Sequence, residues 1–95
     1  MLSISENHAK WLESLSSEHQ KFIVQLQKKD NYPELLAGYA SAVYQTRTKK
    51  DRKAAAIEMA EQALILGNKQ QANVESILQK ISWYTQDQIL GWHYP

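Results

Sequence analysis

Apolar residues recur along the chain at intervals of three and four positions, which is the spacing of one face of an α-helix. The first such stripe lies between Glu6 and Lys28. Its members are His8, Leu12, Leu15, His19, Phe22 and Leu26. Alternation of β-branched residues, which would indicate strands, does not occur, and the chain holds only three glycines and two prolines. The pattern therefore predicts an all-α protein.

The first stripe leaves two interpretations open at Ser16 and Ser17. The segment Ser17-Glu18-His19-Gln20 has the spacing of a capping box, which predicts that a second helix begins there. The apolar positions stay in phase across the two serines, however, and this fits a single long helix. Both alternatives stand at this point.

Polar segments predict the boundaries of the next two helices. Asn31 can cap a helix with Glu34 as its return partner and Pro33 in the first turn, and the helix should run to about Thr46. Asp51 is the expected N-cap of a helix over 52–66, which Gly67-Asn68 should end. Charges interrupt the apolar stripe between the two segments, so one continuous helix over 33–66 is disfavoured.

The C-terminal part shows two more helix starts. Asn68-Lys69-Gln70-Gln71 resembles a capping box and predicts a helix to about Tyr84. Thr85-Gln86-Asp87-Gln88 can cap a short helical turn through Leu90, which Gly91 closes. Four to five helices with short connections predict one domain over residues 1–95, a small antiparallel helical bundle.

The segment 56–66 places alanines at 56, 60 and 63, which allow a neighbouring helix to approach closely. In this it resembles the second helix of a tetratricopeptide repeat, over about an eighth of the chain. The preceding helix departs from that family, because Tyr39 and Tyr44 do not have the repeat's spacing, and no second copy follows. The resemblance implies a helical hairpin.

Composition narrows the class of protein. The 95 residues are 43% hydrophobic and 22% charged with a net charge of +1, which is typical of one folded domain. A dedicated nucleic-acid or membrane-surface protein usually has a clear basic excess. The chain has no cysteine, no basic and apolar leader and no apolar run of about 20 residues, so we expect a cytoplasmic location without membrane association.

Residues with catalytic chemistry lack useful spacing. His8 and His19 are eleven residues apart, about 16 Å along a helix, so they cannot share a metal ion and are expected at the edge of the core. His93 has no acid at useful spacing, and Glu58 with Glu61 fits an exposed helix face. No phosphate-binding loop or metal motif occurs. We therefore predict no enzyme activity, catalytic residue, cofactor or metal.

A basic cluster lies between the helix that should end at about Thr46 and the helix expected over 52–66. It consists of Arg47, Lys49, Lys50, Arg52 and Lys53. With one acid it carries +4, so the remaining chain carries −3. Arg47, Lys49 and Lys50 would lie at the C-terminus of one helix, where positive charge is favourable. Arg52 and Lys53 would begin the next helix, where positive charge opposes the helix dipole. This favours an acidic protein partner, and a nucleic-acid-binding regulator using 47–53 is the alternative.

Aromatic residues gather near the C-terminus. They are Trp83, Tyr84, Trp92 and Tyr94. One interpretation is a lid over the open end of the bundle, and the other is a set of anchors for a partner. Since neighbours on a helix cannot both point into the core, either Trp83 or Tyr84 should face outward or into another chain.

Together these patterns predict a non-catalytic protein–protein interaction module. By analogy with bundles of this size, its class is that of adaptors, chaperones, antitoxins or immunity and inhibitor proteins. The partner is another protein, for which an acidic surface is the expected match, and a homodimer is left open. Nucleic acid is the disfavoured partner.

Overall fold

The computed structural model describes the backbone of residues 3–46, 50–70 and 72–91, and the side chains of 3–46, 52–70 and 72–86. This part of the chain forms six helices and no strand, which confirms the predicted all-α class. The helices are α1 (Ile4–Glu13), α2 (Ser17–Leu26), α3 (Tyr32–Gln45), α4 (Lys50–Lys69), α5 (Val74–Lys80) and α6 (Ser82–Gly91). None of the helices that the structure describes has the length and apolar character to cross a membrane.

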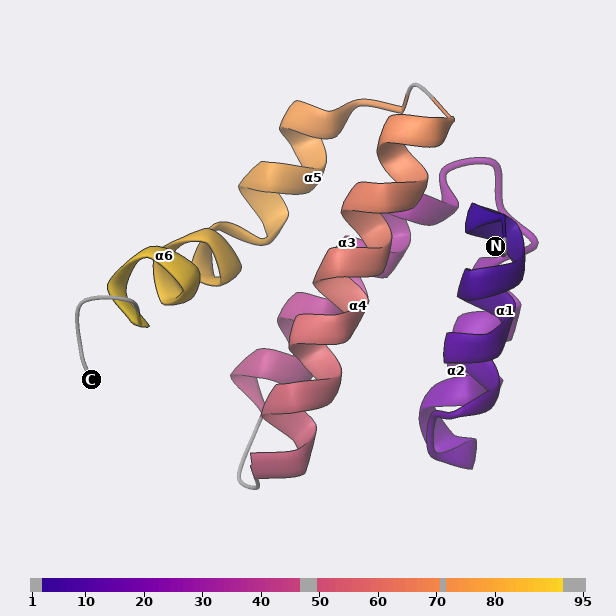
Figure 1. Cartoon of the computed structure of the whole chain (residues 1–95), viewed down its shortest axis with the longest axis horizontal. Coiled ribbons are helices and arrows are strands. Elements are labelled where there is room, and N and C mark those ends of the chain that lie inside the picture. Colours follow the sequence, from indigo (N-terminus) through magenta and orange to yellow (C-terminus); the bar gives the residue numbers. More distant parts are fainter. Residues whose placement is uncertain (1–2, 47–49, 71, 92–95) are drawn as a thin grey trace.

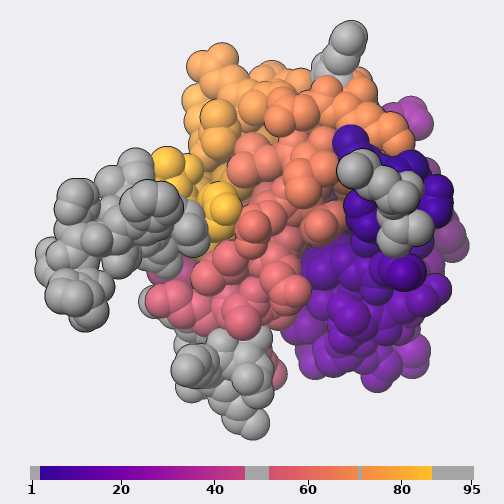
Figure 2. All heavy atoms as spheres, in the orientation of Figure 1, coloured from indigo at the N-terminus to yellow at the C-terminus, as the bar shows by residue number. Residues whose placement is uncertain are grey.

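An antiparallel pair of helices, α3 and α4, forms the centre of the molecule (Figure 1). The α1–α2 hairpin packs on one side of this pair, and α5 and α6 continue on the other. In the space-filling view, α1 and α2 (indigo to violet) and α5 (orange) border opposite sides of α4 (Figure 2). The central pair thus supports two separate outer layers.

Small residues line the contact between α3 and α4. Ala37 and Ala40 on α3 are fully buried, as are the three alanines at 56, 60 and 63 on α4. Their short side chains allow close approach of the two backbones, as the sequence indicated. Larger side chains, Leu36, Met59, Ile77 and Ile81 among them, complete the core.

The first apolar stripe is divided between two helices, so the single-helix alternative is wrong. The α1 helix ends at Glu13, and α2 begins after Ser16, which occupies the N-cap position in extended backbone geometry. The expected capping box at Ser17 does not form, because Ser16 rather than Ser17 precedes the helix and no side chain caps it. After the break, α2 runs back along α3, while α1 lies on α4.

Two predicted boundaries around α4 and α5 are wrong. The α4 helix begins at Lys50, before the expected cap Asp51, and continues through Gly67 and Asn68 to Lys69. Glycine is tolerated inside the helix because α5 packs against its bare Cα. The expected capping box at 68–71 therefore does not start α5. Instead Asn73 caps it, accepting a hydrogen bond from the Ser76 amide (3.1 Å).

The C-terminal helices are divided earlier than predicted. A helix reaching Tyr84 and a cap at Thr85 were expected, yet α5 ends at Lys80 and α6 starts at Ser82. The intervening Ile81 leaves helical geometry (φ −113°, ψ 34°) with its side chain fully buried. Six helices rather than four or five result, and the change of direction at Ile81 carries Trp83 onto α3.

Candidate functional site

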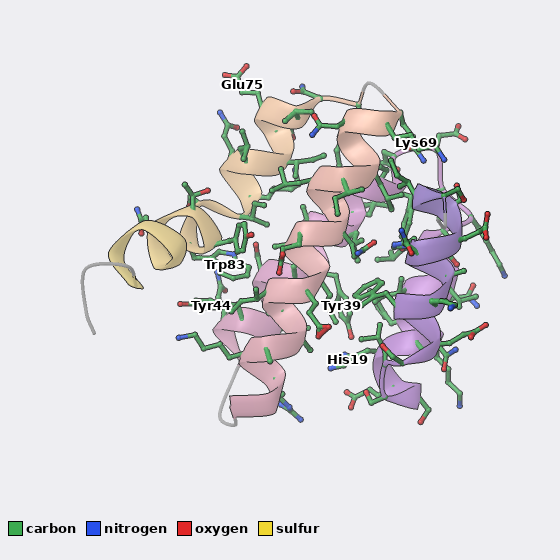
Figure 3. The ribbon with its side chains drawn as sticks, viewed as in Figure 1. His19, Tyr39, Tyr44, Lys69, Glu75 and Trp83 are labelled. Atoms are coloured by element: carbon green, nitrogen blue, oxygen red, sulfur yellow. The ribbon has the colours of Figure 1, made fainter. Side chains whose placement is uncertain are left out.

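Trp83 stacks on Tyr44, which joins the start of α6 to the end of α3. The two ring centroids are 4.0 Å apart with planes inclined by 18°, and Figure 3 shows the two side chains facing each other. The indole Nε1–H of Trp83 donates to Ser41 Oγ at 2.9 Å. Ser41 Oγ also makes a hydrogen bond with the Lys80 carbonyl. A stacked face and a directed hydrogen bond therefore fix the orientation of Trp83.

A cation and a second tyrosine border this stack. The Lys53 Nζ lies 5.9 Å from the Tyr44 ring centroid, a cation–π distance. Tyr84 meets Trp83 edge to face, with centroids 6.2 Å apart. Burial, and then the nearby Glu61 carboxylate, raises the pKa of the Tyr84 hydroxyl above its ordinary value. We call Tyr44, Lys53, Trp83 and Tyr84 the aromatic–basic surface.

Neither Trp83 nor Tyr84 faces wholly outward, and the alternative that one ring faces another chain stays a prediction. Both rings are partly buried and pack against the core, because the break at Ile81 tilts α6 so that its first turn lies along α3 and near α4. Trp92 and Tyr94 lie outside the described residues. At 83 and 84 the rings combine a buried and an exposed part, and the lid and the anchor interpretations both stay predictions.

The structure separates the basic cluster. Arg47 and Lys49 lie outside the described residues, and Lys50 begins α4 with its side chain outside them too. Arg52 is exposed and borders a groove shared with His19, whereas Lys53 is directed to Tyr44. Consecutive positions on a helix are about 100° apart, so the two side chains leave α4 on different sides. Lys53 alone among the described basic residues of the cluster contacts the aromatic stack.

The groove beside Arg52 lies between α2 and the α3–α4 pair. One hollow of about 400 Å³ and a second of about 180 Å³ share Glu18, His19 and Arg52 in their linings. His19 Nδ1 lies 2.9 Å from the Tyr39 hydroxyl, as Figure 3 displays. Glu58 adds a second carboxylate to the larger hollow. With two acids and one arginine, the groove has no net positive charge that would attract an anion, and no function is assigned to it.

His8 is buried in a closed hydrogen-bonded group. Its Nδ1 lies 2.8 Å from Gln62 Oε1 and its Nε2 lies 2.7 Å from the Tyr32 hydroxyl. Only 5% of its surface is exposed, so it lies deeper than the core edge predicted for it. Burial lowers the pKa of His8 below its ordinary value, and burial also raises the pKa of Tyr32. With both ring nitrogens engaged, His8 offers no free lone pair to a metal or a substrate proton.

Tyr44 in the aromatic stack and three residues that form hydrogen bonds at these sites were missed in the sequence. Ser41, Tyr32 and Gln62 supply the hydrogen bonds to Trp83 and His8. Their partners are 42, 24 and 54 positions away, so no local spacing could have revealed them. The position of Ser41 one turn before Tyr44 and Gln45 gave no chemical signal of its own.

Within the described residues, no group of three or more histidines and acids is placed to hold a metal ion. Comparison of the chain with protein families, curated proteins and solved structures gives no match. Any function assigned to the aromatic–basic surface is therefore argued from the geometry of its own residues.

Proposed function

We propose that the chain is a non-catalytic protein-interaction module that binds a protein partner at the aromatic–basic surface. One observation carries the proposal: Lys53 of the basic cluster lies over Tyr44, and Tyr44 stacks on Trp83 of the aromatic segment. The sequence indicated each feature separately as a binding element, and both are in contact within one surface.

The construction of this surface supports a role in recognition. Trp and Tyr are the side chains that contribute most to protein interfaces, because they bury a large area and lose few rotamers. The hydrogen bond from Trp83 to Ser41 and the stack on Tyr44 hold the rings before any partner arrives. Such preorganisation reduces the entropy lost on binding.

The charges favour an acidic protein over nucleic acid. Lys53 provides positive charge at the surface, which would accelerate and orient the approach of an acidic partner. The Glu61 carboxylate close to Tyr84 would repel the dense, regular charge of a phosphate backbone, whereas a protein partner can present a neutral group there. A cytoplasmic location and the absence of catalysis stay predictions from the sequence.

Site-specific photo-crosslinking tests the proposal. The photoreactive benzoylphenylalanine is placed at Thr85, which is exposed on α6 beside Tyr84, and separately at Gln25, which is exposed on α2. In an extract of the source cells, a protein that crosslinks at Thr85 and not at Gln25 is the expected result. A product of twice the 11.0 kDa chain mass would identify a second copy as the partner.

The identified partner is then titrated against matched charge reversals. Lys53→Glu should weaken binding by about tenfold or more, equal to about 1.4 kcal/mol. Lys21→Glu, the same change on the exposed face of α2, should alter it by less than about twofold. Unchanged affinity for Lys53→Glu with an intact melting curve would overturn the assignment of this surface. Retardation of a DNA or RNA duplex at low salt that disappears at high salt would favour the nucleic-acid regulator instead.

A further inference from the structure

The α1–α2 hairpin joins the central pair through apolar side chains and through histidine links. Among the described residues, Leu12 and Ile23 are its buried hydrophobic side chains, and Trp11, Leu15 and Leu26 pack half-buried against the same core. Three of its polar links involve histidine: His8 bonds to Gln62 on α4 and Tyr32 on α3, and His19 bonds to Tyr39 on α3. Because His8 links α1 to both helices of the central pair, a change at His8 can affect how this layer is held.

The hydrogen bonds of His8 are all satisfied when the imidazole is neutral. Gln62 Oε1 can only accept a hydrogen bond, so Nδ1 carries the proton. Nε2 then holds a lone pair, to which the Tyr32 hydroxyl donates. Both nitrogens, the Gln62 oxygen and the Tyr32 proton are satisfied in this arrangement, and no charge is present.

A proton added at Nε2 disrupts the arrangement. The new N–H would meet the Tyr32 hydroxyl proton, so the hydroxyl would have to turn and leave its own proton without the acceptor it has now. The imidazolium would also be 5% exposed and surrounded by uncharged groups. The pocket beside it is lined by Ser5, Gln27, Tyr32, Leu66 and Gln70. A buried charge without a counter-ion is costly.

Among the residues that the structure describes, no carboxylate contacts the His8 ring. On α1, Glu6 Oε1 accepts from Ser3 Oγ (3.1 Å), and Lys10 is exposed. On α4, Lys69 Nζ donates to Ser5 Oγ (2.7 Å), which adds positive charge near this pocket, and Glu58 lines the groove by Ser14 and Ser16.

Aromatic side chains also lie against the His8 ring. On α3, Tyr32 is the titratable group that touches it, and on α1 the centroid of the Trp11 ring lies 5.2 Å from the His8 centroid. The turn before α3 contributes Gln27 to the pocket, while Lys28, Lys29 and Asp30 there are exposed.

We propose that the α1–α2 hairpin is an acid-releasable cover of the α3–α4 pair, which the neutral side chain of His8 holds in place. Protonation of His8 in the released hairpin gives the charge access to water. Release would uncover the apolar surface of α3 and α4 that Leu12 and Ile23 cover. The aromatic–basic surface, marked by Tyr44 and Trp83 in Figure 3, lies on the other side of the central pair, so this device does not depend on the proposed function.

The direction of the pH dependence follows from burial. The pKa of His8 in the closed molecule lies below its ordinary value of 6.5, which it regains when the released hairpin exposes it. As pH falls below 6.5, the released form binds the proton first. The equilibrium constant for release of the hairpin therefore increases by about tenfold per pH unit. Growth stops at the pKa of the closed form. Above pH 6.5 the equilibrium is constant.

Hydrogen exchange of the full chain, read by mass spectrometry and corrected for intrinsic rates, tests the proposal between pH 7.5 and 5.0. Amides of 4–26 should lose protection as pH falls below 6.5, by up to about tenfold per unit until the pKa of the closed form is reached, while amides of α3 and α4 retain theirs. His8→Gln should remove this pH dependence, because glutamine does not titrate. His19→Gln, at the other histidine link, should preserve it.

Three results would overturn the proposal: equal loss of protection in all helices, unchanged protection of 4–26 down to pH 5.0, or the same pH dependence in His8→Gln. A second measurement covers a His8→Gln variant that fails to fold. In the unsubstituted chain, the midpoint of the NMR titration of the His8 Cε1–H must lie at the pH where the loss of protection in α1 levels off. A midpoint at another pH would contradict control by His8.

Discussion

Gly67 on α4 lies directly against Ile77 on α5: a Cβ atom added to Gly67 would come within 2.6 Å of the Ile77 Cδ1. Both residues are buried, and the next nearest atom, Pro33 Cβ, would be 3.9 Å away. The missing side chain therefore sets the distance at which α5 packs on α4. This contact explains why a glycine occurs inside α4, two residues before its end.

Gly67→Ala should lower the free energy of unfolding by about 1 kcal/mol. Overpacking against Ile77 costs about 1–3 kcal/mol, and the better helix propensity of alanine returns about 1 kcal/mol. Gly38→Ala in α3 is the matched control, because nothing lies within 4 Å of its added Cβ, and it should stabilise by about 0.5–1 kcal/mol. Urea unfolding of both variants measures the opposite signs. In a Gly67→Ala, Ile77→Val double variant, which lacks the crowding Cδ1, the combined loss should be smaller than the sum of the single losses.

Tyr32→Phe should destabilise the protein more than Tyr39→Phe. The first removes the donor to the buried Nε2 of His8 and leaves it unsatisfied, which costs about 1–3 kcal/mol. The second removes the partner of a histidine that is only partly buried, and water can replace it at a cost below about 1 kcal/mol. Equal effects in thermal or urea unfolding would contradict the distinction drawn from burial.

Stability should decline at alkaline pH through Tyr32. Burial raises the pKa of Tyr32 above its ordinary value of 10.0. Above pH 10.0 the unfolded chain loses the phenolic proton and the folded chain keeps it, so the unfolded state binds fewer protons and the free energy of unfolding falls as pH rises. Urea unfolding between pH 9 and 11.5 should give a shallower decline for Tyr32→Phe than for the unsubstituted chain.

Two asparagines at N-cap positions should differ in their contribution. Asn73 Oδ1 accepts from the Ser76 amide, so Asn73→Ala should cost about 1 kcal/mol. Asn31 precedes α3 without a side-chain cap bond, and Asn31→Ala should change stability by less than about 0.5 kcal/mol. Thermal unfolding of both variants checks the contrast. A similar loss in each would show that the backbone preference, rather than the bond, matters at both sites.

Ser41→Ala should loosen α6 without removing its aromatic contact. The substitution takes away the acceptor of the Trp83 indole N–H, and the cost is about 1 kcal/mol. Trp83→Ala also removes the stack on Tyr44 and should cost about 2–3 kcal/mol, below the loss for a fully buried aromatic because the ring is partly exposed. Near-UV circular dichroism should change strongly in the second variant and weakly in the first.

Helix identity could be predicted from the sequence better than helix ends. The periodic stripes gave the all-α class and the close packing of the alanines on α4, because both depend on local spacing. The end at Gly67 was wrong since tertiary packing against Ile77, rather than local preference, places that glycine. The break at Ile81 has no proline or glycine to indicate it, and a long-range contact of Trp83 accompanies it.

The candidate site could be predicted in type and only partly in geometry. Aromatic and basic residues were predicted to be binding elements, and Lys53 and Trp83 lie around one tyrosine. Tyr44 itself was missed as a member, because stacking depends on how α6 crosses α3. Arg52 was grouped with Lys53 by sequence, although helical geometry directs it to the groove by His19.

The long sequence separation of the hairpin's links has a consequence during biosynthesis. Residues 4–26 leave the ribosome before Tyr32, and well before Gln62, the two partners that hold His8. Until α4 is synthesised, Leu12 and Ile23 lack the surface that buries them, so the nascent hairpin is a segment that a chaperone can recognise. The central pair, whose two helices are neighbours in sequence, can close as soon as it emerges, and residues 4–26 dock only then, although they are made before it.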